Sequence, residues 1–279
     1  MTPRALARPK TLYSCYTARM PLLRAKLFIV AVTSLLICCR AAEKPAETTP
    51  PELVVAAAAN LTEAFQEIGA AFTRESGIRV LYNFGATTQL MQQIEQGAPF
   101  DVFAAADTIH LDRLVQSGKV LGDSRAVYAR GRLALWIPET SRVSLRDLSD
   151  LLQPSVRFIA IANPEIAPYG AAAVEVLEKQ NLWQPLESKM VRAENVSAAK
   201  QLAATGNADA VFTAYSLVLN APGRVILIDE TMHSPIDQAL GIVAASEQTQ
   251  RARRFTDFVL GQPGRAALTR FGYTFPAAP

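Results

Sequence analysis

The chain has 279 residues, half of them apolar, which is enough to bury one large core or two smaller ones. Its formal net charge of +3 comes from the first 42 residues, which carry seven basic side chains and no acidic one, whereas residues 43–279 have a net charge of −4. A nucleic-acid partner usually shows as a basic domain or stripe, so we expect no nucleic acid as a partner.

Residues 1–42 have the pattern of an export leader. A basic segment precedes an apolar run over 27–37, which is shorter than a membrane-spanning helix requires. We expect this leader, for which Met20 is a second candidate start, to be removed near residue 42, and the protein to be periplasmic. A lipid anchor on Cys38 or Cys39 is the alternative, which the bulky residue before Cys38 disfavours.

Cysteine and histidine usage argues against thiol and zinc chemistry. All three cysteines lie in or before the leader, so the exported chain is expected to have neither a thiol nor a disulfide. The two histidines, His110 and His233, are far apart and show no metal-ligand spacing. Because no nucleophile motif, phosphate loop or dinucleotide fingerprint is present, we expect no enzyme activity and no cofactor.

Residues 43–51 are rich in Ala, Pro, Thr and Glu and are predicted to form a flexible tether. Strands and helices alternate after it. Strands are predicted from residue 54 and over 78–84 and 100–105, and the helices that follow them end near residues 75, 94 and 118. Three such alternations in a short span are typical of a parallel sheet with helical crossovers.

A second section begins with an apolar strand over 132–137. The elements predicted next are a helix over 144–152, a strand over 157–162 and a helix over 171–180. A helix opened by residues 193–197 and running to 204 follows, then a strand over 208–212 and a short helix starting at 213–216. Strands over 224–228 and 238–245 and closing helices over 248–260 and 263–271 complete the chain. This order predicts an α/β fold of two lobes, each a mainly parallel sheet flanked by helices. Lobe 1 is expected to comprise 52–131 with 238–279, and lobe 2 to comprise 132–237.

The candidate binding residues lie where predicted strands or loops run into helices. Asn60 follows the first buried strand and, with Glu63 three residues later, is expected to form a capping box. The other starts contain Thr87 with Thr88, Tyr169 with Gly170, Asn195 with Val196, and Thr213. Ligands of open parallel sheets bind beyond the carboxyl ends of the strands, where these turns lie, and two lobes can close on them by a hinge.

A helix start attracts small anions through its unpaired N–H groups and the positive end of its dipole. No Lys or Arg lies in these turns, and four helix starts would offset about two negative charges, which suits a tetrahedral dianion. A site made only of donors would disfavour hydrogen phosphate unless Glu165 or Glu194 accepted its proton. The alternative for each residue taken singly is a plain helix cap.

Short motifs follow one another along the chain: AAANLT at 57–62, FGATTQL at 84–90, QIEQGAP at 93–99, DVFAAAD at 101–107, NPE at 163–165, AENV at 193–196 and FGY at 271–273. In this order and spacing they resemble the periplasmic molybdate-binding proteins, the solute receptors of molybdate ABC importers. The likeness covers residues 52–276. It implies a two-lobed fold that holds molybdate or tungstate through hydroxyl and backbone N–H donors, without direct metal ligands, and that delivers the anion to an ABC permease.

Carried over by position, the resemblance implies oxyanion contacts from Asn60, Thr87, Tyr169, Val196 and Thr213, with Thr88, Gly170 and Tyr215 as further candidates. Asn60 stands where the family usually has a serine, Tyr169 where it has a small residue, and Thr213 where some members have a tyrosine. We expect a monomer. The alternatives are a receptor for sulfate, phosphate or a small organic anion, a regulatory sensor, and an enzyme on the same fold.

Overall fold

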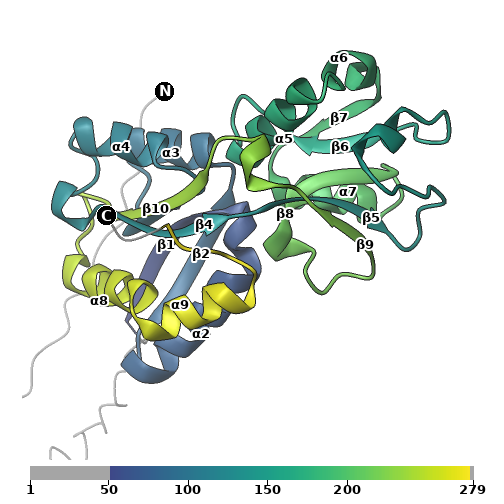
Figure 1. Cartoon of the computed structure of the whole chain (residues 1–279). Helices are drawn as coiled ribbons and strands as arrows, with labels where there is room; N and C mark the ends of the chain where they lie inside the picture. The colour runs from purple at the N-terminus through teal and green to yellow at the C-terminus, as the bar shows by residue number, and fades with distance from the viewer. Residues whose placement is uncertain (1–50, 277–279) are drawn as a thin grey trace, which may run out of the picture. The chain divides into compact units, whose positions relative to one another are not determined.

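A computed structural model describes residues 51–276, which form two lobes, each built on a five-stranded sheet (Figure 1). The first sheet contains, in spatial order, β2 (Arg79–Gly85), β1 (Glu52–Ala58), β3 (Val102–Ala105), β10 (Ile236–Ile242) and β4 (Ala126–Gly131). The second contains β7 (Met190–Ala193), β6 (Ile159–Ala162), β8 (Ala210–Ala214), β5 (Leu133–Pro138) and β9 (Gly223–Leu227). The predicted leader and the tether up to residue 50 lie outside the described residues.

Four of the five strands in each sheet point the same way. β2, β1 and β3 are parallel, β10 is antiparallel to β3, and β4 is antiparallel to β10. The second sheet repeats this plan with β7, β6 and β8, then β5, then β9. The antiparallel strands are β10 in the first sheet and β5 in the second. Each is the first strand after the chain crosses from the other lobe. The predicted two-lobed, mainly parallel α/β fold is confirmed.

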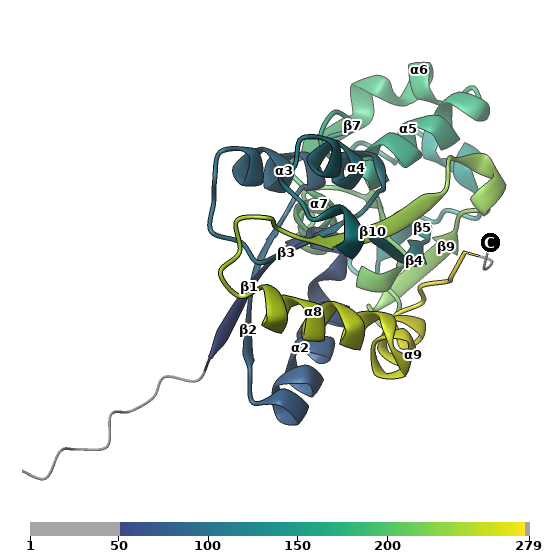
Figure 2. The same cartoon turned by 90° about the vertical axis from the view of Figure 1, so that its left-hand side faces the viewer.

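The first sheet is covered on both faces because its side chains alternate between two cores. Val102 and Ala104 of β3 pack in one core with Phe65 of α2, whereas Phe103 packs in the other with Leu90 of α3. The helices on the first face are α2 (Thr62–Ser76), α8 (Thr249–Leu260) and α9 (Gln262–Arg270), and those on the second are α3 (Thr87–Glu95) and α4 (Ile109–Gln116), as Figure 2 shows.

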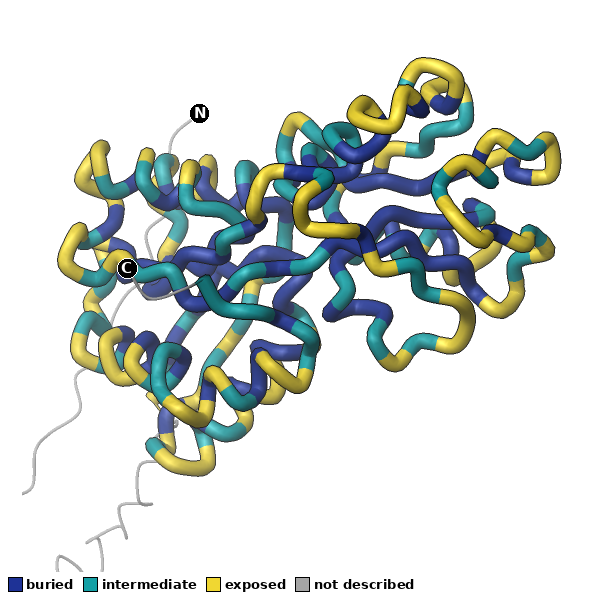
Figure 3. Tube along the Cα trace, viewed as in Figure 1, coloured by how far each residue is buried: buried dark blue, intermediate teal, exposed yellow. Residues whose placement is uncertain are grey.

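The second sheet is flanked by α5 (Pro168–Lys179) and α7 (Val196–Ala204), and α6 (Trp183–Leu186) follows α5. Figure 3 shows that the central strands of both sheets are largely buried, whereas the edge strands β2 and β9 and many connecting loops are partly or fully exposed. The short 3-10 helices are η1 (Ala59–Leu61), η2 (Gly122–Ser124), η3 (Leu148–Leu152), η4 (Glu187–Lys189), η5 (Tyr215–Leu217) and η6 (Glu230–Met232). Within residues 51–276 we find no helix with the length and apolar character needed to span a bilayer.

The chain crosses between the lobes twice. Arg132 alone separates β4 from β5, and the second crossing, over 228–235, joins β9 to β10. Beside the crossings, the guanidinium of Arg130 on β4 binds the carboxylate of Asp237 on β10 through two hydrogen bonds of 2.6 and 3.1 Å. The exact lobe boundaries stay a prediction, although Ile236 already pairs with Gly131 in the first sheet.

Several local predictions differ from the structure. The helix expected over 144–152 is reduced to η3, because the Asp147 carboxylate accepts the N–H of Ser149 and caps the turn there. Thr213 does not start a helix, since β8 runs on through it while paired with Ala134 of β5. The strands β4 and β7 were not predicted, and the partner of β4, the strand β10, lies about a hundred residues further along the chain.

Candidate functional site

A small cavity lies between the lobes, with a volume of about 10 Å³. It is formed by the ends of β1, β2 and β3 and by the starts of the helices that follow. Its lining residues are Ala58, Ala59, Asn60, Gly85, Ala86, Thr87, Ala106, Ala167, Pro168, Tyr169, Asn195 and Val196. None of these residues is charged. Four of the five predicted oxyanion-binding residues therefore lie around one cavity, and Thr213 is the exception.

The cavity wall is made of four helix starts whose first N–H groups are largely left uncapped. Ala58, Ala86 and Ala167 occupy the N-cap positions of η1, α3 and α5, and none of them makes a side-chain capping bond. At α7, Asn195 caps the N–H of Ala198 with its side-chain oxygen at 2.9 Å. The first N–H groups of a helix have no acceptor within that helix, so these starts offer donors and partial positive charge to the cavity.

Asn60 does not form the predicted capping box. Its side-chain Nδ2 donates to Oε1 of Gln238 and to the hydroxyl of Tyr273, both at 2.9 Å. The orientation of Gln238 is fixed in turn, because its Nε2 donates to the carbonyls of Ala106 and Ile236. Both N–H groups of the Asn60 carboxamide thus donate to acceptors in lobe 1. The backbone N–H of Asn60 is then its remaining donor near the cavity.

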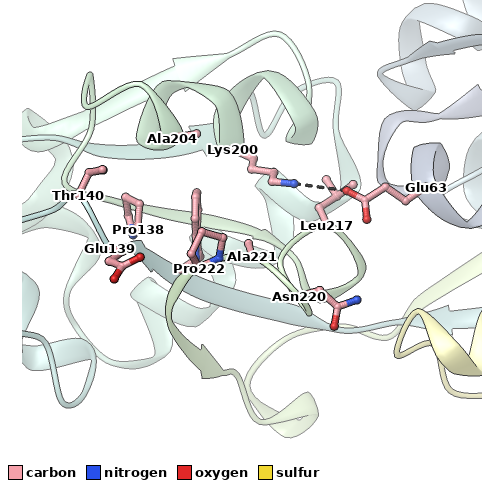
Figure 4. A pocket seen from close by; sticks show the side chains of 11 residues that line it. Glu63, Pro138, Glu139, Thr140, Lys200, Ala204, Leu217, Asn220, Ala221 and Pro222 are labelled. Atoms are coloured by element: carbon pink, nitrogen blue, oxygen red, sulfur yellow. Dashed lines mark hydrogen bonds and ion pairs between the residues drawn. The ribbon is translucent and has the colours of Figure 1, made fainter.

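Glu63 is drawn away from the same helix start by a cation of the other lobe. Its carboxylate lies 3.4 Å from Nζ of Lys200 on α7 (Figure 4). The capping box was therefore wrong at both of its residues, and in both cases a partner more than a hundred residues away in sequence competes successfully for the side chain.

Thr87 presents a hydroxyl to the cavity and is 1% exposed. Its Oγ1 accepts the N–H of Ala106 at 3.2 Å, which leaves the hydroxyl proton available for another acceptor. Thr88 does not line the cavity. Its Oγ1 lies 2.8 Å from Nε2 of His110, whose Nδ1 lies 2.7 Å from Oδ2 of Asp107.

This Thr–His–Asp chain was missed from the sequence, where the histidines were interpreted as isolated. A usable signal was present, because His110 follows Asp107 by three residues and its own N–H donates to the Asp107 carboxylate at 3.0 Å. The chain ties the start of α3 to that of α4. It has the order of groups found in nucleophile triads, but the cavity lining does not include Thr88.

Of the remaining predicted site residues, two line the cavity and three do not. Tyr169 and Val196 line the cavity, whereas Thr213 lies behind it and its hydroxyl donates to the carbonyl of Val196 at 3.3 Å. At Gly170 a Cβ would collide with the carbonyl oxygen of Ala162, so the glycine serves close packing of α5 on β6. Tyr215 lies outside the lining, with the Arg132 guanidinium 5.2 Å from its ring centre.

Hydrogen bonds between the lobes surround the cavity. The Ser197 hydroxyl donates to the carbonyl of Ala59 at 2.9 Å, and the N–H of Thr88 donates to the carbonyl of Ile166 at 3.3 Å. Most lining residues are buried.

A larger surface pocket of about 420 Å³ lies beside the Glu63–Lys200 ion pair (Figure 4). Its lining includes a second acid, Glu139, and the single cation there already neutralises Glu63. None of the predicted oxyanion-binding residues lines it. Its charges do not favour an anion.

Comparison with known proteins shows what this chain is similar to. The family model described as "Bacterial extracellular solute-binding protein" matches residues 53–274. The molybdate-binding protein ModA of Rhodobacter capsulatus is 37% identical over 219 residues, which cover 78% of this chain and 86% of the relative.

Two solved structures share the fold. The periplasmic molybdate-binding protein of Azotobacter vinelandii aligns with a TM-score of 0.77 and 30% identity, covering 80% of this chain and 99% of that one. The sulfate-binding protein SubI of Mycobacterium tuberculosis aligns with a TM-score of 0.67, covering 82% of this chain and 88% of that one. At 18% identity it shows the fold alone.

Proposed function

The chain belongs to the family of bacterial extracellular solute-binding proteins, and within that family we propose that it captures molybdate, or the similar tungstate, between its lobes and delivers it to an ABC permease in the membrane. The observation that carries this proposal is the convergence of four helix starts on one cavity that has no charged side chain. Four such starts offset about two negative charges, which matches a tetrahedral dianion.

The proposed ligand contacts are mostly backbone groups. The N–H groups at Asn60, Tyr169 and Val196 donate to the anion, and Thr87 adds its hydroxyl proton. Thr213 does not contact the anion itself. Its hydroxyl donates to the carbonyl of Val196 and so positions that residue. Because backbone donors do not depend on residue type, the departures from the usual family residues at Asn60 and Tyr169 are compatible with the same site.

The alternatives place different demands on the cavity. Hydrogen phosphate needs an acceptor for its proton, yet no carboxylate lines the cavity, and Glu165 and Glu194 are exposed. Sulfate is the serious competitor, because it is a fully ionised tetrahedral dianion. Discrimination against it would come from size, since metal–oxygen bonds are longer than sulfur–oxygen bonds.

The rest of the proposal concerns context. The protein acts in the periplasm as a monomer, without a cofactor and without catalysis, and molybdate is its cargo. Support comes from the family description, which is of an extracellular protein, and from the basic and apolar pattern of residues 1–42.

Titration calorimetry of the purified protein tests the ligand. We expect one anion per chain, with sub-micromolar dissociation constants for molybdate and tungstate and no heat with sulfate or phosphate. Equal binding of sulfate would establish the broader oxyanion receptor instead. No heat with any of the four anions would contradict the proposal.

A further inference from the structure

The side chain of Tyr169 crosses from lobe 2 into lobe 1. Tyr169 is the second residue of α5, and its ring is 2% exposed. Its hydroxyl packs against Gly131, the last residue of β4, so closely that a Cβ at that position would collide with it. The same hypothetical Cβ would lie 3.0 Å from Nε2 of Gln238 on β10. The phenol therefore ends beside the strands that lead into both crossings.

This hydroxyl is buried and makes no hydrogen bond within residues 51–276. The amide N–H groups closest to this hydroxyl donate to other acceptors. Asn60 donates both side-chain N–H groups elsewhere, and Gln238 donates its own to the carbonyls of Ala106 and Ile236. Burial also raises the pKa of Tyr169 well above its usual value, so the group stays a neutral hydroxyl.

Tyr273 provides the contrast within the same cluster. Its hydroxyl accepts from Asn60 Nδ2 at 2.9 Å and lies 2.8 Å from the Asn60 carbonyl and 3.2 Å from Oγ of Ser216, both within hydrogen-bond reach. Ser216 belongs to lobe 2 and itself donates to the Asn60 carbonyl at 2.9 Å. Two buried tyrosines thus meet the same helix start, one satisfied in the closed arrangement and one not.

The free-energy cost of leaving the Tyr169 hydroxyl without a hydrogen bond arises when the lobes close. Its backbone lies in lobe 2, whereas the groups that surround its hydroxyl, Gly131, Gln238 and Asn60, lie in lobe 1. When the lobes separate, the phenol withdraws from this packing and water can hydrate it. Closing them removes that water without supplying a protein partner, and a buried unpaired hydroxyl is unfavourable.

We propose that the Tyr169 hydroxyl opposes closure of the lobes and so sets the rate at which the bound anion is released. The proposal rests on the proposed function, because it assigns to Tyr169 a second role at the same site. The backbone N–H of Tyr169 contributes to binding the anion, and its side chain lowers the affinity and speeds release. A receptor that must hand over its cargo needs such a limit on affinity.

Three Tyr→Phe variants, at 169, 273 and 128, form a matched test. Calorimetry and stopped-flow release are measured with molybdate as the probe. Tyr169→Phe keeps the ring and the backbone N–H, and we expect at least about fivefold tighter binding, mainly from slower release. Tyr273→Phe removes a satisfied hydroxyl and is expected to weaken binding by at least about fivefold.

Tyr128→Phe is the control, because the Tyr128 hydroxyl makes only a 3.5 Å contact with the carbonyl of Ala105 inside lobe 1. It is expected to change binding by less than about twofold. Thermal unfolding without ligand checks that each variant folds. Weaker or unchanged binding by Tyr169→Phe overturns the proposal while leaving the function intact.

If the wild type binds none of the four anions, the proposed function fails first. The inference is then decided by small-angle X-ray scattering of the ligand-free proteins. A more compact Tyr169→Phe variant supports it, and a radius of gyration equal to that of the wild type overturns it.

Discussion

Thr87 keeps a proton free where the other two predicted threonines do not. Its Oγ1 accepts from Ala106 and lines the cavity, whereas the hydroxyls of Thr88 and Thr213 are engaged with His110 and the Val196 carbonyl. We therefore expect Thr87→Val, which keeps the shape of the side chain, to weaken molybdate binding by about 10- to 100-fold in calorimetry, as for the loss of a hydrogen bond to a charged group.

The neighbouring variant Thr88→Val is its matched control. It removes a hydroxyl of the same kind from the same turn, but one that bonds to His110 at 2.8 Å outside the cavity lining. We expect a change of at most about threefold. A larger loss in Thr88→Val than in Thr87→Val would show that the anion binds on the other side of the helix start.

Sequence patterns could identify the residues around the cavity, but not the hydrogen-bond partners of their side chains. Asn60 was singled out because it follows a buried strand, and the structure does place it at the cavity. Its partners Gln238 and Tyr273 lie 178 and 213 residues away, so no local pattern could reveal that its carboxamide faces the interior. The local sequence predicted that the Asn60 side chain would cap the helix start. Its hydrogen bonds to Gln238 and Tyr273 replace that cap.

At the scale of elements, the strand-to-helix pattern predicted most of the sheet and the four helix starts that meet at the cavity. The prediction worked because buried strands and amphipathic helices have distinct periods. It failed at β4, whose pairing depends on the distant strand β10, and at Thr213, where pairing with β5 extends β8 by two residues. The alanines at three N-cap positions were a local signal of uncapped helix starts.

Helix α7 also fastens one lobe to the other. The Ser197 hydroxyl donates across the lobes to the carbonyl of Ala59, next to the cavity. Ser197→Ala keeps the backbone N–H and removes this bond, so we expect binding about 2- to 10-fold weaker and correspondingly faster release in stopped-flow measurements.

Ser117→Ala is the control for the effect of losing a hydroxyl. Its Oγ bonds to the carbonyl of Leu114 within α4, at 3.2 Å, and takes no part in the contact between lobes. Its binding should equal that of the wild type. Unchanged release in Ser197→Ala would mean that the bond to Ala59 does not contribute to closure.

At the scale of the whole molecule, both lobes bury tyrosine hydroxyls. Burial raises the pKa of Tyr82, Tyr128, Tyr169 and Tyr273 above the usual value, mainly by desolvation. These groups stay protonated in the folded protein at a pH where the unfolded chain, with tyrosine pKa values of about 10, releases its protons. The folded state then binds more protons than the unfolded state, so the free energy of unfolding falls as the pH rises above about 10.

Urea unfolding at a series of pH values between about 8 and 11.5 measures this fall. These tyrosines contribute no slope well below pH 10, and each contributes up to about 1.4 kcal/mol per pH unit above it. Tyr82→Phe loses the hydrogen bond to the carbonyl of Phe65, which lowers stability at every pH, but its curve should be flatter than that of the wild type above pH 10. Equal slopes for the two proteins would show that Tyr82 titrates alike in the folded and unfolded chains, and its burial would then have no consequence for stability at high pH.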